Sequence, residues 1–452
     1  MKQNPGTISL IGRSFICSEC GQKHKVDMLH IEQGDTDRIC LFFKKVFGAN
    51  KKILLLADDI TWEVAGERCK ESLEKEYKVF PVVLIPRNEK RVTAKEGYLP
   101  EIEKKALNTE IILTVGTGTI TDLGKIIGSN RYKPVVCFPT APSMNGYTSP
   151  VAAYIKEGLK LTIPISPAHG VFSDMNILEK SPLELIKSGF ADSMAKAFAN
   201  ADWKISSLIT GESFCPLPYR MVSEAGPSEK DFMDEGELLI RRDHRAIGSL
   251  MQTLNMGGIS MILAGKSSPA SGGEHMISHF LDMYAHQYRG EVFAYHGIQV
   301  GTGIFISSLI YEAMRGLTSS EIKQMIARTK IDYQKYLERL LSLFPAGAEL
   351  IKREFDEKMA QIAVLREKLP GEWKNIREGA FGMVQRPERI AGIFKRAEIP
   401  VHLREIAVGE KMIYDVITLS RFIRGRVTIL DIAGEAGMLE EQLVREYLET
   451  KP

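Results

Sequence analysis

The chain has 452 residues, of which 44% are hydrophobic and 26% are charged, as expected of a globular protein with a sizeable core. Its 59 Lys and Arg residues nearly balance 57 Asp and Glu residues, so the net charge of +2 lacks the strongly basic footprint of a nucleic-acid-binding protein. Its six cysteines are scattered, which excludes a disulfide framework and favours a reducing, cytoplasmic compartment.

The sequence contains no convincing targeting or membrane-spanning segment. The start, "MKQNPGTISLIGRSF", lacks the apolar core of a signal peptide. The two most apolar long windows, 189–210 and 296–314, are interrupted by charged residues or mixed with Gly and Ser. We expect both to be buried helices and no membrane span.

The first part of the chain alternates between strand-like and helical patterns. Strand-like runs occupy residues 52–59, 78–86, 110–116 and 134–140, and the segment between the first two has apolar residues at helical spacing. This rhythm predicts a parallel sheet with crossover helices.

After about residue 180 the pattern becomes almost entirely helical. We therefore predict an α/β, Rossmann-like dinucleotide-binding domain over residues 1–179. An all-α domain over residues 180–452 would follow it.

A glycine-containing turn follows the third strand-like run. In "ILTVGTGTITDLGK", Gly116 and Gly118 stand between an apolar strand and a helix, where a phosphate can approach the backbone and the helix N-terminus. Thr121 occupies the last glycine position of GxGxxG, so an ordinary tight turn remains an alternative. Asp58, at the end of the first strand, suits a ribose hydroxyl or a helix cap equally well.

The segment "PTAPSMNGYTSP" (139–150) follows the fourth strand-like run and is rich in hydroxyl and turn residues. Open α/β sheets bind ligands at the carboxyl ends of their strands, which this segment would line. An ordinary loop punctuated by Pro and Gly is the alternative.

Three polar residues stand in apolar surroundings within the helical part: Asp192, His275 and His296. One carboxylate and two imidazoles would make an open site for a divalent metal. His279 lies four residues after His275, so both project from one helix face, but the zinc-protease motif HExxH is absent. From spacing alone, an ordinary polar pair on a helix remains open.

Taken in order, the motifs resemble the glycerol-1-phosphate dehydrogenase family, within the iron-containing alcohol dehydrogenase and dehydroquinate synthase superfamily. They are "CSECGQKH", "ADDITWEVAG", "GTGTITDLGK", "PTAPSMNGYTS", "GLKLT", "GFADSMAK", "SGGEHMISHF", "YHGIQVGTG" and "RFIRGRVTILDIA". The resemblance implies a dehydroquinate synthase-like fold with the active site in the cleft between the two domains.

By residue match, the resemblance implies one divalent metal, zinc, nickel or iron, bound by Asp192, His275 and His296. His279 would face the substrate and, with Asp192, would serve catalysis. Contacts to NAD or NADP would come from residues in three segments: Asp58, Gly116, Thr117, Gly118, Thr119, Ile120, Asp122, Thr140, Ala141, Pro142, Ser143 and Ser149.

The substrate position departs from the family pattern. Asn145 stands where the family usually has aspartate, and it would meet the hydroxyl groups of the substrate together with Asp192. Asparagine adds a donor and removes a negative charge, which puts the identity of the substrate in doubt. Lys160 in "GLKLT" is a candidate partner for a substrate phosphate.

The predicted reaction is NAD(P)-dependent interconversion of dihydroxyacetone phosphate and sn-glycerol 1-phosphate, a step of phospholipid metabolism. A reductase for another small carbonyl compound, a lyase of the dehydroquinate synthase type and a silent binding protein are the alternatives. The carboxylate of Asp58 would repel a 2′-phosphate and so favour NAD. We expect a cytoplasmic homodimer that has no nucleic-acid partner.

Two further features are less informative. "CSECGQKH" places Cys17, Cys20 and His24 together, with Cys40 further on, but a single CxxC favours a structural β-turn over a second zinc site. The basic segments "IRRDHR" (240–245) and "FIRGR" (422–426) are expected to be solvated helix faces and loops.

Overall fold

The computed structural model describes residues 11–87, 89–224 and 235–449. The first ten residues, on which the expected absence of a signal peptide partly rests, lie outside this range. The chain divides into two compact units, and the division is not contiguous in sequence. The first unit contains residues up to 156, 160–193 and 220–267; the second contains 157–159, 194–219 and 268 onward. The sequence pattern alone indicates a single boundary near residue 180.

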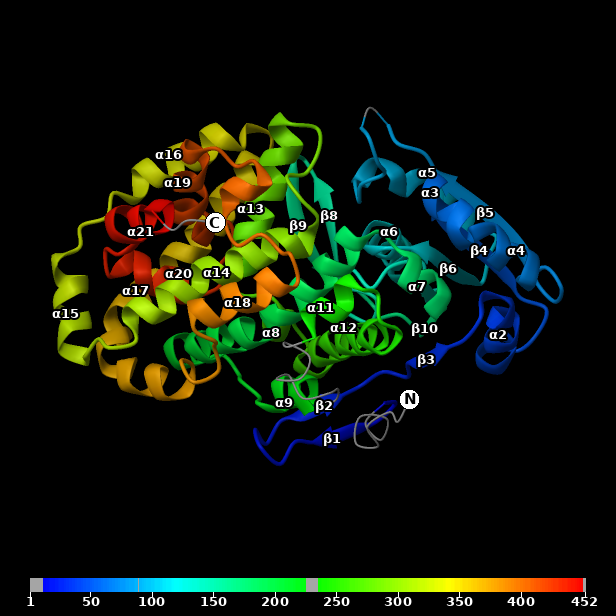
Figure 1. Ribbon diagram of the computed structural model, residues 1–452, viewed down its shortest axis with the longest axis horizontal. Helices are drawn as coiled ribbons and strands as arrows, with labels where there is room; N and C mark the ends of the chain where they lie inside the picture. The colour runs from blue at the N-terminus through cyan, green and yellow to red at the C-terminus, as the bar shows by residue number, and fades with distance from the viewer. Residues whose placement is uncertain (1–10, 88, 225–234, 450–452) are drawn as a thin grey trace. The chain divides into compact units, whose positions relative to one another are not determined.

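The first unit is built on a parallel six-stranded sheet (Figure 1). In chain order the strands are β3 (His30–Gln33), β4 (Lys52–Asp58), β5 (Lys78–Leu84), β6 (Ile111–Gly116), β7 (Val135–Pro139) and β10 (Gly170–Ser173). Their spatial order is β3-β10-β7-β6-β4-β5. The four strands predicted from sequence, β4 to β7, are confirmed; β3 and β10 extend the sheet beyond β7.

The order of the strands indicates where a ligand site is expected. The chain passes from β4 to β5 on one side and then returns to β6 on the other side of β4. Ligands of open α/β sheets bind at such a reversal, beyond the carboxyl ends of the strands. Asp58 ends β4 and Gly116 ends β6, so both stand at this edge.

Helices cover both faces of the sheet. On one face, α2 (Ile39–Phe47) and α4 (Glu67–Leu73) share a buried core with alternate residues of β4, β6 and β7. On the other face, α5 (Leu99–Ala106) packs against β4 and β5, and α6 (Gly118–Asn130) packs against β4 and β6. Because both faces are covered, the central strands are buried throughout and largely apolar, which explains why they read as nearly continuous hydrophobic runs.

The remaining elements of the first unit are short, apart from α12. They are β1 (Ser14–Ile16), β2 (Lys23–Lys25), α3 (Asp59–Thr61), β8 (Val151–Lys156), β9 (Leu159–Pro164), α7 (Met175–Lys180), α11 (Gly236–Ile240) and α12 (His244–Ala264). α8 (Leu183–Thr210) and α9 (Leu217–Glu224) each have residues in both units.

Among the described helices, α12 alone is long and apolar enough to cross a membrane. However, 83% of its apolar window is buried inside the structure. A helix covered in this way is part of a protein core, so its composition is poor evidence for a membrane span.

The second unit is helical, apart from the first residue of β9. Its principal helices are α13 (Gly273–Tyr288), α14 (His296–Met314), α15 (Ser319–Arg328), α16 (Tyr333–Leu343), α17 (Ala348–Gly379), α18 (Pro387–Arg396), α19 (Glu410–Leu419), α20 (Ile429–Glu435) and α21 (Val444–Glu449). The predicted buried helix at 296–314 is α14, whose residues are almost all buried.

Close packing of α13 against α14 brings the first turn of α13 against the middle of α14. A Cβ on Gly303 of α14 would lie 2.5 Å from the carbonyl oxygen of Glu274 on α13, so only glycine allows this approach. The contact stands next to His275, which explains how two helices can place their histidines in one small volume.

Candidate active site

The glycine-containing turn joins β6 to α6 as predicted. Thr117 is the N-cap residue of α6, and Thr140 N donates to the carbonyl oxygen of Gly116 at 3.2 Å. This bond ties the predicted phosphate turn to the start of the loop after β7. Ile120 is fully buried, side chain and backbone alike, so this predicted cofactor residue has no exposed surface.

Gly124 allows the close helix–strand packing for which Thr121, at the last position of the GxGxxG pattern, is too large. A Cβ on Gly124 would lie 2.1 Å from Cγ2 of Thr114 on β6, which requires glycine where α6 crosses the strand. In dinucleotide-binding folds the last glycine of the motif allows this close helix–strand contact. The position is therefore displaced by three residues in this chain.

Asp58 caps the helix that follows β4. Its Oδ1 accepts from the backbone N–H and the hydroxyl of Thr61, each at 2.7 Å, and its own N–H donates to Thr61 Oγ1 at 3.1 Å. The capping alternative raised by the sequence is thus confirmed. Both hydrogen bonds to the carboxylate use one oxygen, so a cap and a ribose contact are compatible.

The polar loop after β7 is held by a lysine that the sequence analysis passed over. Lys125 of α6 is fully buried, and its Nζ donates to the carbonyl oxygens of Gly146, Ser149 and Val151 at 2.6–3.1 Å. Burial lowers its pKa, and Asp122 opposes that shift. The available signal was a lysine beside Gly124 on an otherwise apolar helix face.

Asp122 stands on α6 and contacts strand β8 of the hairpin β8–β9. Its Oδ2 accepts from the backbone N–H of Ala153 at 3.2 Å, and Oδ1 is 3.9 Å from Lys125 Nζ. Burial raises the pKa of Asp122 to about 6, against the opposing effects of Lys125 and Lys160. Lys160, the predicted phosphate partner, is therefore close enough to Asp122 to act on it electrostatically.

The rest of the loop is ordered by its own hydroxyl groups. Tyr147 donates to the carbonyl oxygen of Ala141 at 2.7 Å and lies 3.3 Å from Ser143 Oγ. Ser149 Oγ donates to the carbonyl oxygen of Val151 at 2.8 Å. The predicted cofactor residues of the first unit, apart from Asp58, thus belong to one hydrogen-bonded turn and loop.

Asn145 and Asp192 lie together in the first unit. Asn145 donates from its backbone N–H to Asp192 Oδ2 at 2.9 Å and from Nδ2 to Oδ1 at 3.3 Å. Asp192 stands on α8 and is 1% exposed. The two predicted substrate residues are brought together, and the amide of Asn145 contacts the carboxylate of Asp192 directly.

Three histidines of the second unit converge. The ring centroids of His275 and His296 are 5.2 Å apart, and His279 lies 6.3 Å from the first and 5.8 Å from the second. His275 and His279 stand on α13, and His296 begins α14. His275 and His296 offer ligand nitrogens within 4.8 Å of one another. The spacing of four residues predicted a shared face, and the structure adds His296 to it.

The two predicted metal ligands each have a hydrogen-bond partner on Nδ1. His275 Nδ1 is 2.8 Å from Glu274 Oε1, and His296 Nδ1 is 3.0 Å from Ser278 Oγ. Glu274 and Ser278 are fully buried. Metal-binding histidines usually engage their second nitrogen in this way, which leaves Nε2 as the ligand atom. Neither partner stands out in the sequence by itself, although Glu274 is adjacent to His275 and Ser278 follows it by three residues.

A second buried carboxylate lies beside Glu274. Asp202 accepts from the N–H groups of Gly273 and Ile429 and from the hydroxyl of Tyr311, at 2.8–3.0 Å. Burial, followed by the charge of Glu274, raises the pKa of Asp202. Asp202 thereby anchors the first turn of α13, on which His275 stands.

His279 is contacted by Arg424, whose Nη2 lies 2.6 Å from its Nδ1. Burial, then repulsion from Arg426, lowers the pKa of Arg424 to about 10. Arg426 donates to the carbonyl oxygen of Ser271, and Arg421 is 1% exposed. The prediction that 422–426 is a solvated segment is therefore wrong: its arginines pack against the turn that carries the histidines.

The other basic segment is also partly engaged. Arg242 donates to the carbonyl oxygens of Glu179 and Ser181, and His244 contacts the carboxylate of Glu179. These contacts join the start of α12 to the end of α7. The expectation of a solvated face at 240–245 is wrong for Arg242, whereas the side chain of His244 is 69% exposed.

Comparison with known proteins agrees with this site. Residues 30–182 match the model of a family described as iron-containing alcohol dehydrogenase. A protein of Bacillus licheniformis named glycerol-1-phosphate dehydrogenase, NAD(P)+, is 28% identical over 96% of this chain and 95% of its own length. A protein of the same name from Halalkalibacterium halodurans is 30% identical over 66% of this chain and 75% of its own length.

Solved structures support the fold. The crystal structure of a probable glycerol dehydrogenase from Sinorhizobium meliloti is 14% identical and matches with a TM-score of 0.58, over 92% of this chain and 97% of that one. At this identity the likeness bears on the fold alone. The curated relatives show that the chain belongs to the glycerol-1-phosphate dehydrogenase family of the iron-containing alcohol dehydrogenase superfamily.

Proposed function

We propose that this protein is an NAD(P)-dependent, divalent-metal-dependent dehydrogenase that interconverts dihydroxyacetone phosphate and sn-glycerol 1-phosphate. The relatives in Bacillus licheniformis and Halalkalibacterium halodurans carry that enzyme name. The observation that carries the proposal in this chain is the trio of converging histidines, two of which have Nδ1 held by buried partners.

Asp192, His275 and His296 are the proposed metal ligands. Nε2 of each histidine is the remaining ligand atom once Nδ1 is engaged. One carboxylate and two imidazoles accept zinc, nickel or iron(II), and the set leaves positions for a substrate oxygen. When bound, a metal of this kind supplies Lewis-acid polarisation of a carbonyl or hydroxyl oxygen.

The cofactor is proposed to lie along the carboxyl edge of the sheet. The turn from Gly116 to Ile120 would receive the pyrophosphate, and Asp58 Oδ2 would accept from a ribose hydroxyl while Oδ1 caps α3. Asp122, Ser143 and Ser149 line the hydrogen-bonded turn and loop that would bound the same cofactor. A bound nicotinamide supplies or accepts the hydride.

His279 is the proposed group for the substrate proton. Arg424 donates to Nδ1, so the proton of the neutral imidazole stands on Nε2, from which it can be given to a substrate oxygen. The planar guanidinium of Arg424 matches the geometry of a phosphate group, so Arg424 joins Lys160 as a candidate phosphate partner.

Asn145 is proposed to position Asp192 while facing the substrate hydroxyl groups. Its two donations orient the carboxylate, and its amide oxygen remains an acceptor for a hydroxyl group. A neutral amide thus replaces the family's charged aspartate and still leaves an acceptor for the polyol.

The deciding experiment is NADH oxidation by the purified, metal-reconstituted protein. Dihydroxyacetone phosphate is compared with unphosphorylated dihydroxyacetone and a panel of small aldehydes. Strong preference for the phosphorylated ketone, with glycerol 1-phosphate as product, is expected. Activity confined to unphosphorylated carbonyl compounds would overturn the substrate assignment.

Cofactor preference, assembly and compartment stay predictions. We expect NAD to be preferred over NADP because the carboxylate of Asp58 repels a 2′-phosphate. We also expect a homodimer in the cytoplasm, the assembly being the commonest for homo-oligomers. Kinetics with both cofactors, sedimentation and cell fractionation test these points.

A further inference from the structure

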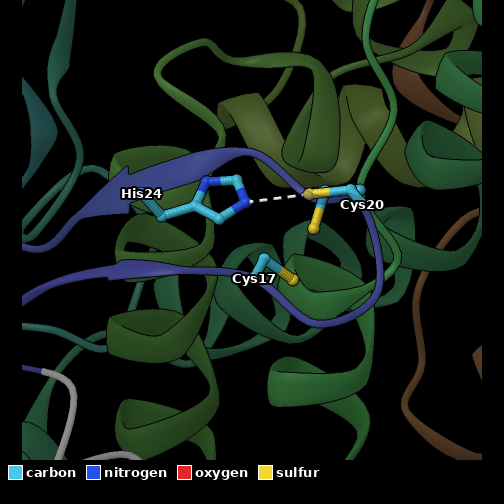
Figure 2. Close-up of side chains that lie close together, drawn as sticks. Cys17, Cys20 and His24 are labelled. Carbon is cyan, nitrogen blue, oxygen red and sulfur yellow. Dashed lines mark hydrogen bonds between the residues drawn. The ribbon is translucent and has the colours of Figure 1, made fainter.

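The N-terminal hairpin gathers three metal-ligating side chains outside the proposed active site. β1 and β2 are antiparallel, with Phe15 opposite His24. The loop between them is tight: Cys17 N donates to the carbonyl oxygen of Gln22 at 2.8 Å, and Gly21 N donates to that of Cys17 at 2.9 Å. Figure 2 shows Cys17, Cys20 and His24 drawn together at this tip.

Their ligand atoms are close enough for a single ion. Cys20 Sγ is 3.2 Å from His24 Nε2, and the atoms offered by Cys17, Cys20 and His24 all lie within 4.8 Å of one another. A tetrahedral zinc ion with Zn–S near 2.3 Å and Zn–N near 2.0–2.1 Å separates its ligand atoms by about 3.5–3.8 Å. The cluster thus needs only small adjustments to surround zinc.

The histidine is oriented as a ligand. His24 Nδ1 lies 2.7 Å from the carbonyl oxygen of Leu263 near the end of α12, so its proton is on Nδ1 and Nε2 carries a lone pair toward the thiols. His24 is 5% exposed and Cys17 is 3% exposed.

A fourth zinc ligand can be sought among the other cysteines of the chain. Cys40 and Cys69 belong to the core against the sheet, and Cys137 of β7 donates to the carbonyl oxygen of Tyr147. Cys215 is the thiol left over, and it is 2% exposed. The chain continues from it to Arg220, whose guanidinium pairs with Glu19, a residue between Cys17 and Cys20.

We propose that Cys17, Cys20, His24 and Cys215 bind one structural zinc ion, separate from the metal of the dehydrogenase site. Three thiolates and one imidazole form a closed, four-coordinate set with no position for substrate. The ion would stabilise the fold of the hairpin, while the hydride-transfer residues are untouched. The proposal differs from the expectation, drawn from the sequence, of a plain structural β-turn.

Cobalt substitution tests the site selectively. The protein is reduced, stripped of metal and titrated with Co²⁺. Thiolate-to-cobalt charge transfer absorbs in the near ultraviolet, and only a site with cysteine ligands produces it. The wild type and His275→Ala are both expected to show the band, because the proposed active site contains no cysteine. Cys20→Ser is expected to lose most of it, whereas Cys40→Ala, a matched thiol control from the core, keeps it.

Metal stoichiometry provides the second measurement. When the metal-free protein is loaded with Zn²⁺ alone, zinc content is expected to fall from about two ions per chain in the wild type to about one in Cys20→Ser and about one in His275→Ala. Absence of the charge-transfer band in the wild type overturns the proposal, whether or not the variants fold. A full band in Cys215→Ser overturns the assignment of the fourth ligand, and a full band in Cys20→Ser overturns the site.

Discussion

Asn145 holds Asp192 through two donors, its backbone N–H at 2.9 Å and its side-chain amide at 3.3 Å. The family's usual aspartate at this position would set two carboxylates against each other at the same distance. Asparagine turns that repulsion into attraction, since Nδ2 donates to a carboxylate oxygen. The departure from the family pattern therefore has a local physical reason, independent of any change in substrate.

Asn145→Asp is expected to destabilise the metal-free protein and to increase its response to divalent metal. The lost charge-assisted hydrogen bond and the added like charge cost about 1.5–3 kcal/mol. Thermal unfolding with and without saturating metal measures both effects. Asn145→Ala is the control, because it loses the hydrogen bond without adding charge. A metal-free Asn145→Asp protein as stable as the wild type would contradict this account.

Glu274→Gln is expected to weaken metal binding and to strengthen the metal-free fold. The change removes the carboxylate that holds His275 Nδ1, and loss of such a partner lowers metal affinity about 10–100-fold. It also removes the charge that raises the pKa of the neighbouring Asp202, so repulsion between two buried carboxylates is relieved.

Competition with a chelator measures the affinity, and urea unfolding of the metal-free protein measures the stability. Glu312→Gln, at an ion pair with Arg315, is the control on the same unit. Equal metal affinity in wild type and Glu274→Gln would argue against His275 as a ligand.

Arg424→Met is expected to raise KM for dihydroxyacetone phosphate much more than for unphosphorylated dihydroxyacetone. The guanidinium is the proposed phosphate partner, and it also holds His279 Nδ1. His279→Gln should instead lower kcat, by about 10²–10⁴-fold for loss of general acid–base catalysis, with metal retained. Steady-state kinetics with both ketones separates the two roles. Arg404→Met, at a surface pair with Glu410, serves as the control; equal effects of Arg424→Met on both ketones would refute a phosphate contact.

Asp122→Asn is expected to make stability less dependent on pH. The pKa of Asp122 is raised from 3.8 to about 6 by burial, so the folded state holds this proton more tightly than the unfolded chain. The resulting stabilisation is present below about pH 4 and is lost as pH rises through 6.

Between these values the free energy of unfolding of the wild type should fall relative to that of Asp122→Asn, by at most about 3 kcal/mol. Urea unfolding at several pH values measures the difference. Asp59→Asn, at an exposed neighbour of the capping residue Asp58, should run parallel to the wild type. A constant difference between Asp122→Asn and the wild type would show that Asp122 titrates normally.

The sequence by itself determined the α/β architecture, the strands β4 to β7 and the family. These follow from local patterns. Strands covered on both faces are largely apolar and can be recognised as hydrophobic runs. A strand–helix turn that a phosphate can approach needs glycines directly after the strand, and these are visible in the sequence. The histidines of α13 could also be placed on one face, because helical spacing sets the direction of side chains.

The tertiary structure decided what depends on residues far apart in the chain. Contacts of Arg424 with His279 and of Asn145 with Asp192 join segments separated by 145 and 47 positions, and no local pattern encodes such pairs. The same holds for Lys125, whose charge could be buried only because three loop carbonyls converge on it. Cys20 and His24 were visible as a motif in the sequence. The carbonyl oxygen of Leu263, which His24 also contacts, belongs to α12 and lies 239 positions away in the chain. A buried polar group without a hydrogen-bond partner is costly, so its role depends on the partner that folding brings to it. For these residues the partner lies far away in the chain, and only the tertiary structure shows it.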